Sequence, residues 1–88
     1  MSKETINVLL DIHEQISAIP AIFREKVCVD CNWSLPTFYR KLRTKDKPNP
    51  HRKGEMIPAL SNAEKQKIIE IMDEVYDSFR DNMEKYRR

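Results

Sequence analysis

Residues 27–43 read VCVDCNWSLPTFYRKLR, a pattern typical of two helices joined by a turn of about three residues. Apolar positions at i, i+4 and i+8 predict the first helix, over residues 21–31: Phe23, Val27 and Cys31. Cys28 is a small residue in the middle of that helix, where a second helix can cross closely. Asn32 follows where the turn needs a residue that tolerates positive φ, and Asn is the usual substitute for Gly there. The stretch therefore predicts a closely packed pair of helices.

The second helix of this pair is predicted over residues 35–43. Ser34 is a favoured N-cap, and Pro36 is tolerated in the first turn because its missing N–H would have no partner there. Helical spacing places Leu35, Phe38 and Leu42 on an inward face and Pro36, Arg40 and Arg43 on an outward face. One side of this helix is therefore apolar and the other side is cationic.

Residues 3–18 predict a further helix, capped by Ser2, and Pro20 is expected to separate it from the helix over residues 21–31. Its apolar positions form two nearly opposite stripes, one of Ile6, Leu9, Leu10, His13 and Ile16 and one of Val8, Ile12 and Ile19. A helix that is apolar on two sides is expected to lie between two partners. His13 is then expected to be a packed histidine rather than a metal ligand.

Residues 44–58 hold three prolines, the only glycine and several cations, which predicts a long basic loop, either functional or a disordered linker. Ser61 and Glu64 form a capping box that begins a helix over residues 61–86. An apolar stripe follows this helix for about 24 residues and ~36 Å: Ile68, Met72, Val75, Phe79, Met83 and Tyr86. So long a helix either wraps around the others or offers a surface to a second chain.

The length of 88 residues suits a single helical domain over residues 1–88, and the expected fold class is all-α. One glycine leaves no Gly-rich phosphate loop and few of the turns of an all-β fold, so a nucleotide-dependent enzyme is not expected. No apolar run approaches the ~20 residues of a membrane span, and the first residues lack the order of a signal peptide. The expected location is the cytoplasm, with no membrane partner.

Positive charge is concentrated in one part of the chain. The net charge is only +2, but residues 34–53 carry seven Lys or Arg against Asp46 alone, while the remainder is neutral to slightly acidic. Local positive charge is the electrostatic footprint of a nucleic-acid site. The alternative is an ordinary solvated basic face on a helical bundle.

The sequence does not favour a zinc site, a redox site or a catalytic site. Cys28 and Cys31 form a C-x-x-C pair, but inside a predicted helix, with no second pair and only His13 and His51 as histidines. Two small apolar residues in a reducing compartment are therefore favoured over a zinc or redox site. Because no nucleophile, base and orienting group fall together, no catalytic residue, metal site or cofactor is predicted, and the chain is not expected to be an enzyme.

Residues 24–43 resemble the DNA-binding helix-turn-helix of small bacterial and phage transcriptional regulators. Its second helix commonly runs Ser, two variable residues, Thr, apolar, Tyr, Arg, any residue, Leu, then Lys or Arg, which is matched by Ser34, Thr37, Phe38, Tyr39, Arg40, Leu42 and Arg43. Two positions depart from this pattern, since Asn32 replaces a common glycine and Lys41 a common apolar residue. Lys41 either loosens the last turn or reaches a phosphate with its stem buried. The resemblance implies a helix-turn-helix over residues 22–43 within a three-helix core, followed by the long amphipathic C-terminal helix.

The function that this resemblance and the basic block together predict is sequence-specific binding of double-stranded DNA. The protein would be a small transcriptional regulator or mobile-element accessory factor, acting as a homodimer through its C-terminal helix. Two arginines would read guanine edges in the major groove, and the other residues would contact bases or phosphates. The predicted DNA-binding residues are Ser34, Pro36, Thr37, Tyr39, Arg40, Lys41, Arg43, Lys45, Lys47, Arg52 and Lys53. The alternative is a helical protein–protein interaction module that docks a partner on the stripe of the C-terminal helix.

Overall fold

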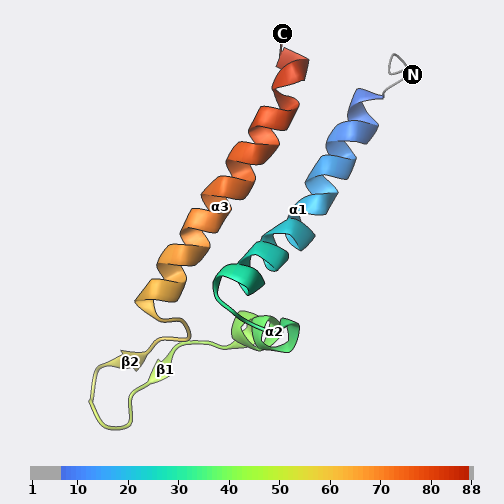
Figure 1. The fold of residues 1–88 in the computed structure, drawn as a ribbon. Coiled ribbons are helices and arrows are strands. Elements are labelled where there is room, and N and C mark those ends of the chain that lie inside the picture. The colour runs from blue at the N-terminus through green and yellow to red at the C-terminus, as the bar shows by residue number, and fades with distance from the viewer. Residues whose placement is uncertain (1–6, 88) are drawn as a thin grey trace.

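The computed structural model describes residues 7–87, which form three α-helices and one small two-stranded hairpin (Figure 1). The elements in chain order are α1 (Val8–Asp30), α2 (Leu35–Arg43), β1 (Lys47–Pro48), β2 (Met56–Ile57) and α3 (Asn62–Met83), followed by a 3₁₀ turn over Glu84–Arg87. Helices α1 and α3 run antiparallel and pack against each other, while α2 and the hairpin lie together at one end of this pair. The fold is mostly helical, as the sequence predicts.

Helix α1 is continuous, so the predicted break at Pro20 is wrong. A proline inside a helix removes one backbone hydrogen bond and costs about 3 kcal/mol. The helix continues because both of its halves pack against α3: Ile12 and Ile19 are half-buried before the proline, and Val27 is buried after it. The predicted cap Ser2 and the apolar Ile6 lie outside the described residues. Asn7 is the N-cap of α1, and its Oδ1 accepts a hydrogen bond from the Leu10 N–H.

The apolar core lies at the α2 end of the helix pair. It is made by Val27 of α1, Phe38 of α2, and Ile71 and Val75 of α3. Ile71 is fully buried although the predicted stripe omits it; it lies between Ile68 and Val75 on the same helical face. Few side chains are buried, and the molecule extends over 64 × 26 × 20 Å.

The inward face predicted for α2 is wrong at two of its three positions. Phe38 is buried, but Leu35 is 50% exposed and Leu42 is 67% exposed. The reason is that α2 has only nine residues and packs on the end of the α1–α3 pair around a single central side chain. The element is held by one aromatic anchor and by its polar contacts.

The region predicted as a basic loop contains a short antiparallel hairpin, with Lys47 opposite Ile57 and Pro48 opposite Met56. Its tip is closed by the Asn49 N–H, which donates to the Glu55 carbonyl at 2.9 Å. Gly54 has φ of +86°, a left-handed conformation that glycine adopts without strain. Local turn chemistry therefore produces a hairpin that alternating hydrophobicity does not reveal.

Candidate nucleic-acid interface

The turn between α1 and α2 is fixed by backbone hydrogen bonds. Asn32 has φ of +56°, as predicted for this position. The Trp33 N–H donates to the Cys28 carbonyl at 2.8 Å, and the Asn32 N–H donates to the Val29 carbonyl at 3.2 Å. This pair of bonds is the Schellman arrangement that ends a helix at a left-handed residue. The direction of α2 relative to α1 is therefore set within three residues.

The start of α2 is capped by Ser34, whose hydroxyl contacts both the backbone and the side chain of Thr37. The Ser34 hydroxyl accepts from the Thr37 N–H at 3.2 Å and donates to the Thr37 hydroxyl oxygen at 3.0 Å. Because the Thr37 oxygen accepts this bond, its own hydroxyl hydrogen can be donated to a ligand. Because a helix N-terminus carries partial positive charge, a phosphate oxygen is a suitable acceptor at this point.

The outward face of α2 carries four of the predicted residues. All four are exposed and lie within about a third of the helix circumference: Pro36, Tyr39, Arg40 and Arg43. The rings of Tyr39 and Phe38 pack edge-to-face, with centroids 5.4 Å apart and planes at 87°. This contact limits the directions that the Tyr39 side chain can take. Within residues 7–87, neither arginine forms an ion pair. Both guanidinium groups are therefore available to an external ligand.

Lys41 is the exception among the cations of α2, since its side chain turns toward the body of the protein. Its ammonium group donates to the Ala59 carbonyl at 3.4 Å and lies 3.8 Å from a Glu64 carboxylate oxygen. It also lies 5.8 Å from the centroid of the Trp33 ring. The structure thus places Lys41 apart from Arg40 and Arg43, bracing α2 against the start of α3.

The hairpin and the segment that leads into it from α2 carry the remaining predicted cations, and all of them are exposed: Lys45, Lys47, Arg52 and Lys53. Arg52 forms an exposed ion pair with Glu55 at 3.5 Å. The base of the hairpin is closed by Asp46, whose carboxylate accepts from the Ala59 N–H at 2.8 Å. Ala59 therefore ties the hairpin to Lys41 of α2. This connection places the hairpin cations at the same end of the molecule as α2 (Figure 1).

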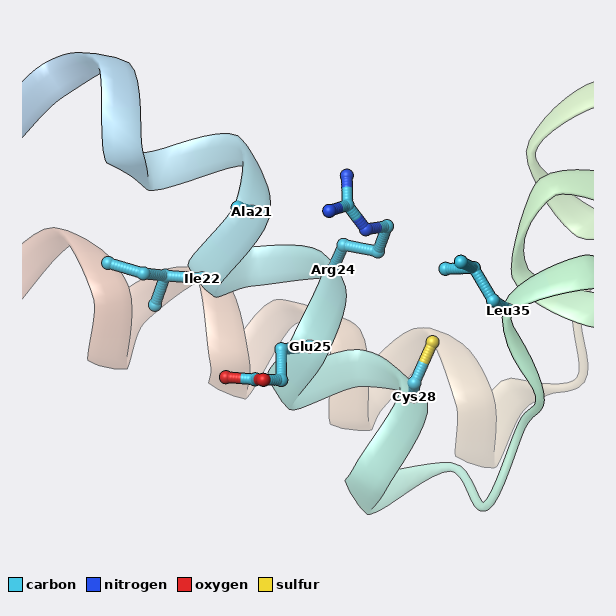
Figure 2. Close-up of a pocket in the computed structure, with 6 residues that line it drawn as sticks. All are labelled: Ala21, Ile22, Arg24, Glu25, Cys28 and Leu35. Atoms are coloured by element: carbon cyan, nitrogen blue, oxygen red, sulfur yellow. The ribbon is translucent and has the colours of Figure 1, made fainter.

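Sequence reasoning missed one cation beside α2. Figure 2 shows Arg24 on α1, next to a cleft of about 340 Å³ between α1 and α2 into which Leu35 of α2 also reaches. Arg24 is half-buried, and within residues 7–87 it forms no ion pair. The sequence could have indicated Arg24, because it lies four residues before Cys28 and therefore on the same helical face as the residue where the second helix was expected to cross.

The other candidate groups show no comparable assembly. Cys28 and Cys31 are free and half-buried, and burial raises the pKa of the Cys31 thiol, which disfavours the thiolate that metals and redox partners require. Among residues 7–87, no group of three or more His, Cys, Asp or Glu is placed to hold a metal ion. His13, predicted to be packed, is exposed on α1.

Comparison of the chain with known protein families, with characterised proteins and with solved structures finds no match. Within residues 7–87, none of the helices combines the length and the apolarity needed to cross a membrane.

Proposed function

We propose that this protein binds double-stranded DNA sequence-specifically, with α2 as the recognition helix in the major groove, as a small transcriptional regulator or mobile-element accessory factor. The observation that carries the proposal is the outward face of α2. Arg40 and Arg43 are exposed and unpaired within residues 7–87, on a helix whose direction the Asn32 turn fixes. An arginine fork can bond both O6 and N7 of a guanine and discriminates against the wrong base by about 1–3 kcal/mol.

The cations around α2 support the same proposal. Lys45, Lys47 and Lys53 are exposed on the hairpin beside α2, and Arg24 lies next to α2 on α1. Such groups suit the phosphates that flank a groove-bound helix, where they position the protein without reading sequence. The start of α2, with Ser34 and Thr37, is suited to a further phosphate.

The test is fluorescence anisotropy of labelled duplex DNA at two salt concentrations. The variant Arg40→Ala/Arg43→Ala is compared with Lys85→Ala/Arg87→Ala, which removes the same charge from exposed positions in the last turn, far from α2. For the wild type, a plot of the logarithm of the binding constant against the logarithm of the salt concentration is expected to fall with a slope of about −0.9 per phosphate contacted. Only the α2 variant is expected to lose binding.

If both variants lose DNA affinity equally, the binding depends only on the net charge of the protein, which would contradict a groove-bound α2. Absence of binding at low salt would contradict the proposal altogether. If binding is found, selection from a random duplex library is expected to enrich a sequence with wild-type protein but not with the α2 variant.

A second candidate function, a helical protein–protein interaction module, is favoured by one observation. Ile69, Met72 and Tyr76 of α3 are each at least 50% exposed. This function predicts that Arg40→Ala/Arg43→Ala leaves partner binding unchanged, whereas substitution of Met72 abolishes it.

A further inference from the structure

Helix α3 has an exposed apolar flank beside its buried face. Ile69, Met72 and Tyr76 follow each other at i, i+3 and i+7 and are 50%, 53% and 56% exposed. The outward side of the same helix is acidic, with exposed carboxylates at Glu70, Glu74, Asp77 and Asp81, and Asp73 lies at the border with the apolar flank, four residues after Ile69. The apolar flank is therefore the side of α3, outside its buried face, that is suited to burial by a partner, and the acidic side is suited to solvent.

Helix α1 continues this apolar surface. Leu9 and Ile16 are 77% and 50% exposed, although they lie on one stripe at i and i+7. A groove of about 180 Å³ runs between α1 and the apolar flank of α3, lined by Ile19, Phe23, Met72, Val75, Tyr76 and Phe79. Ile16 lies one turn from Ile19, so both stripes border this groove. We call the surface formed by Leu9, Ile16, Ile69, Met72 and Tyr76 the apolar face.

The molecule exposes more surface than its mass requires. Its accessible area is 7249 Å², whereas a compact monomer of 10.5 kDa exposes about 5,400 Å². The excess of about 1,800 Å² is more than the roughly 800 Å² that each partner contributes to a stable interface. One layer of two helices therefore leaves enough accessible area for an interface.

We propose that a second copy of this chain covers the apolar face, so that two α1–α3 pairs form a four-helix bundle with both α2 helices at the same end. Two copies are compatible here because face-to-face stacking buries the uncharged apolar face, leaves most acidic residues of α3 on its outer side and places Asp73 at the rim of the interface. A two-fold axis gives each copy the same contacts, as in most homodimers. The parallel orientation rests on the proposed function, since only this arrangement presents two recognition helices to adjacent turns of one duplex, about 34 Å apart.

The first experiment is sedimentation equilibrium without DNA, at 10 to 100 µM protein. Wild type is expected to have twice the 10.5 kDa mass of the chain. Two variants each add one carboxylate to an exposed position of α3: Met72→Glu on the apolar face and Gln66→Glu outside it, beside Glu70 of the acidic side. We expect the Met72 variant to be monomeric at concentrations where the Gln66 variant remains dimeric.

A monomeric wild type at 100 µM would overturn the proposal, as would an unchanged dimer in Met72→Glu. Circular dichroism at each concentration checks the helix content. If Met72→Glu unfolds, the milder Ile69→Gln, at another half-exposed position, must weaken dimerisation while keeping its helix content, or the proposal fails. Because these measurements need no DNA, their failure leaves the DNA-binding test intact.

The orientation is tested by energy transfer between dyes attached to the N-terminal amine, in dimers mixed from donor- and acceptor-labelled protein. Helix α1 begins at the end of the molecule opposite α2, and the molecule is 64 Å long. A parallel bundle brings the two dyes to one end and is expected to give strong transfer. A dimer without transfer would overturn the parallel orientation and, with it, the placement of two α2 helices on one duplex.

Discussion

At the α2 end of the molecule, α1 and α3 are joined by an apolar core, whereas at the opposite end the contacts include a polar cluster. The core contains Val27 and Ile71, which are 1% and 0% exposed. At the other end, the Tyr86 hydroxyl donates to the Asp11 carboxylate at 2.5 Å, and the Lys85 ammonium lies 3.3 Å from the same carboxylate. Met83 is the buried apolar side chain nearest to this cluster in sequence.

The difference between the two ends indicates which end contributes more to the stability of this thin molecule. Burial of apolar side chains gives a large and salt-independent contribution, while partly exposed polar pairs contribute little. The α2 end is therefore expected to unfold last, and the opposite end to open first. The end that is expected to be more stable also carries the candidate DNA-binding surface.

The largest expected effect comes from the core. Ile71→Ala removes a fully buried side chain that the surrounding helices cannot replace, so we expect a loss of about 3–4 kcal/mol in the free energy of unfolding. Met83→Ala, at the other end, is expected to cost about 2 kcal/mol. Urea unfolding followed by circular dichroism measures both. Equal losses would remove the distinction between the two ends.

The turn before α2 is expected to give a smaller effect. Asn32 has φ of +56°, where an alanine side chain is strained, so Asn32→Ala is expected to lower the free energy of unfolding by about 1–2 kcal/mol. Asn32→Gly is the matched control, because glycine adopts this conformation freely. An alanine variant as stable as the glycine variant would show that the turn does not depend on the left-handed residue.

The two kinds of cation on α2 are expected to differ in DNA binding. Arg43→Gln removes an outward cation and is expected to lower the salt slope by about 0.9 if it contacts one phosphate, or to relax base preference if it reads a base. Lys41→Gln is expected to leave the slope unchanged, since its ammonium is held by Ala59 and Glu64. The measurement is anisotropy over a range of salt concentrations. A lower slope in Lys41→Gln would show that this side chain turns outward to DNA.

The smallest expected effect is a pH dependence of the polar cluster. The hydrogen bond from Tyr86, followed by the contact with Lys85, holds the pKa of Asp11 below its ordinary value of 3.8. The stabilisation is therefore fully present above pH 3.8 and is lost as the pH falls through the lowered pKa. We expect the difference in melting temperature between wild type and Asp11→Asn to vanish under these acidic conditions. A difference that does not shrink as the pH falls below 3.8 would mean that the Asp11 charge does not contribute.

The sequence predicts those features that depend on neighbours within four residues. Ser34 caps α2, Ser61 and Glu64 form the capping box of α3, and Asn32 takes the left-handed conformation. The outward position of Arg40 and Arg43 follows from helical spacing alone. Most of the candidate surface on α2 was therefore visible in the sequence, although its function stays a prediction.

Contacts between distant residues could not be predicted in this way. Pro20 lies inside a continuous helix because α3 packs on both sides of it, and Lys41 turns inward because Ala59 and Glu64 lie there. Arg24 joins the candidate surface only because α2 crosses α1 beside it. The periodicity of α3 likewise permits either flank to be buried, and the position of α1 decides that Ile71 is buried and Met72 is exposed.

The sequence by itself thus determined where three of the helix boundaries fall, how the chain turns before α2 and which charges α2 carries. These depend on backbone conformation and capping, whose energies are local. The tertiary structure alone decided which apolar stripes are buried, which cations are free and which face remains uncovered. Those outcomes depend on the packing of helices that are far apart in the chain. A periodic pattern shows that a helix has an apolar face, but not which other helix covers that face.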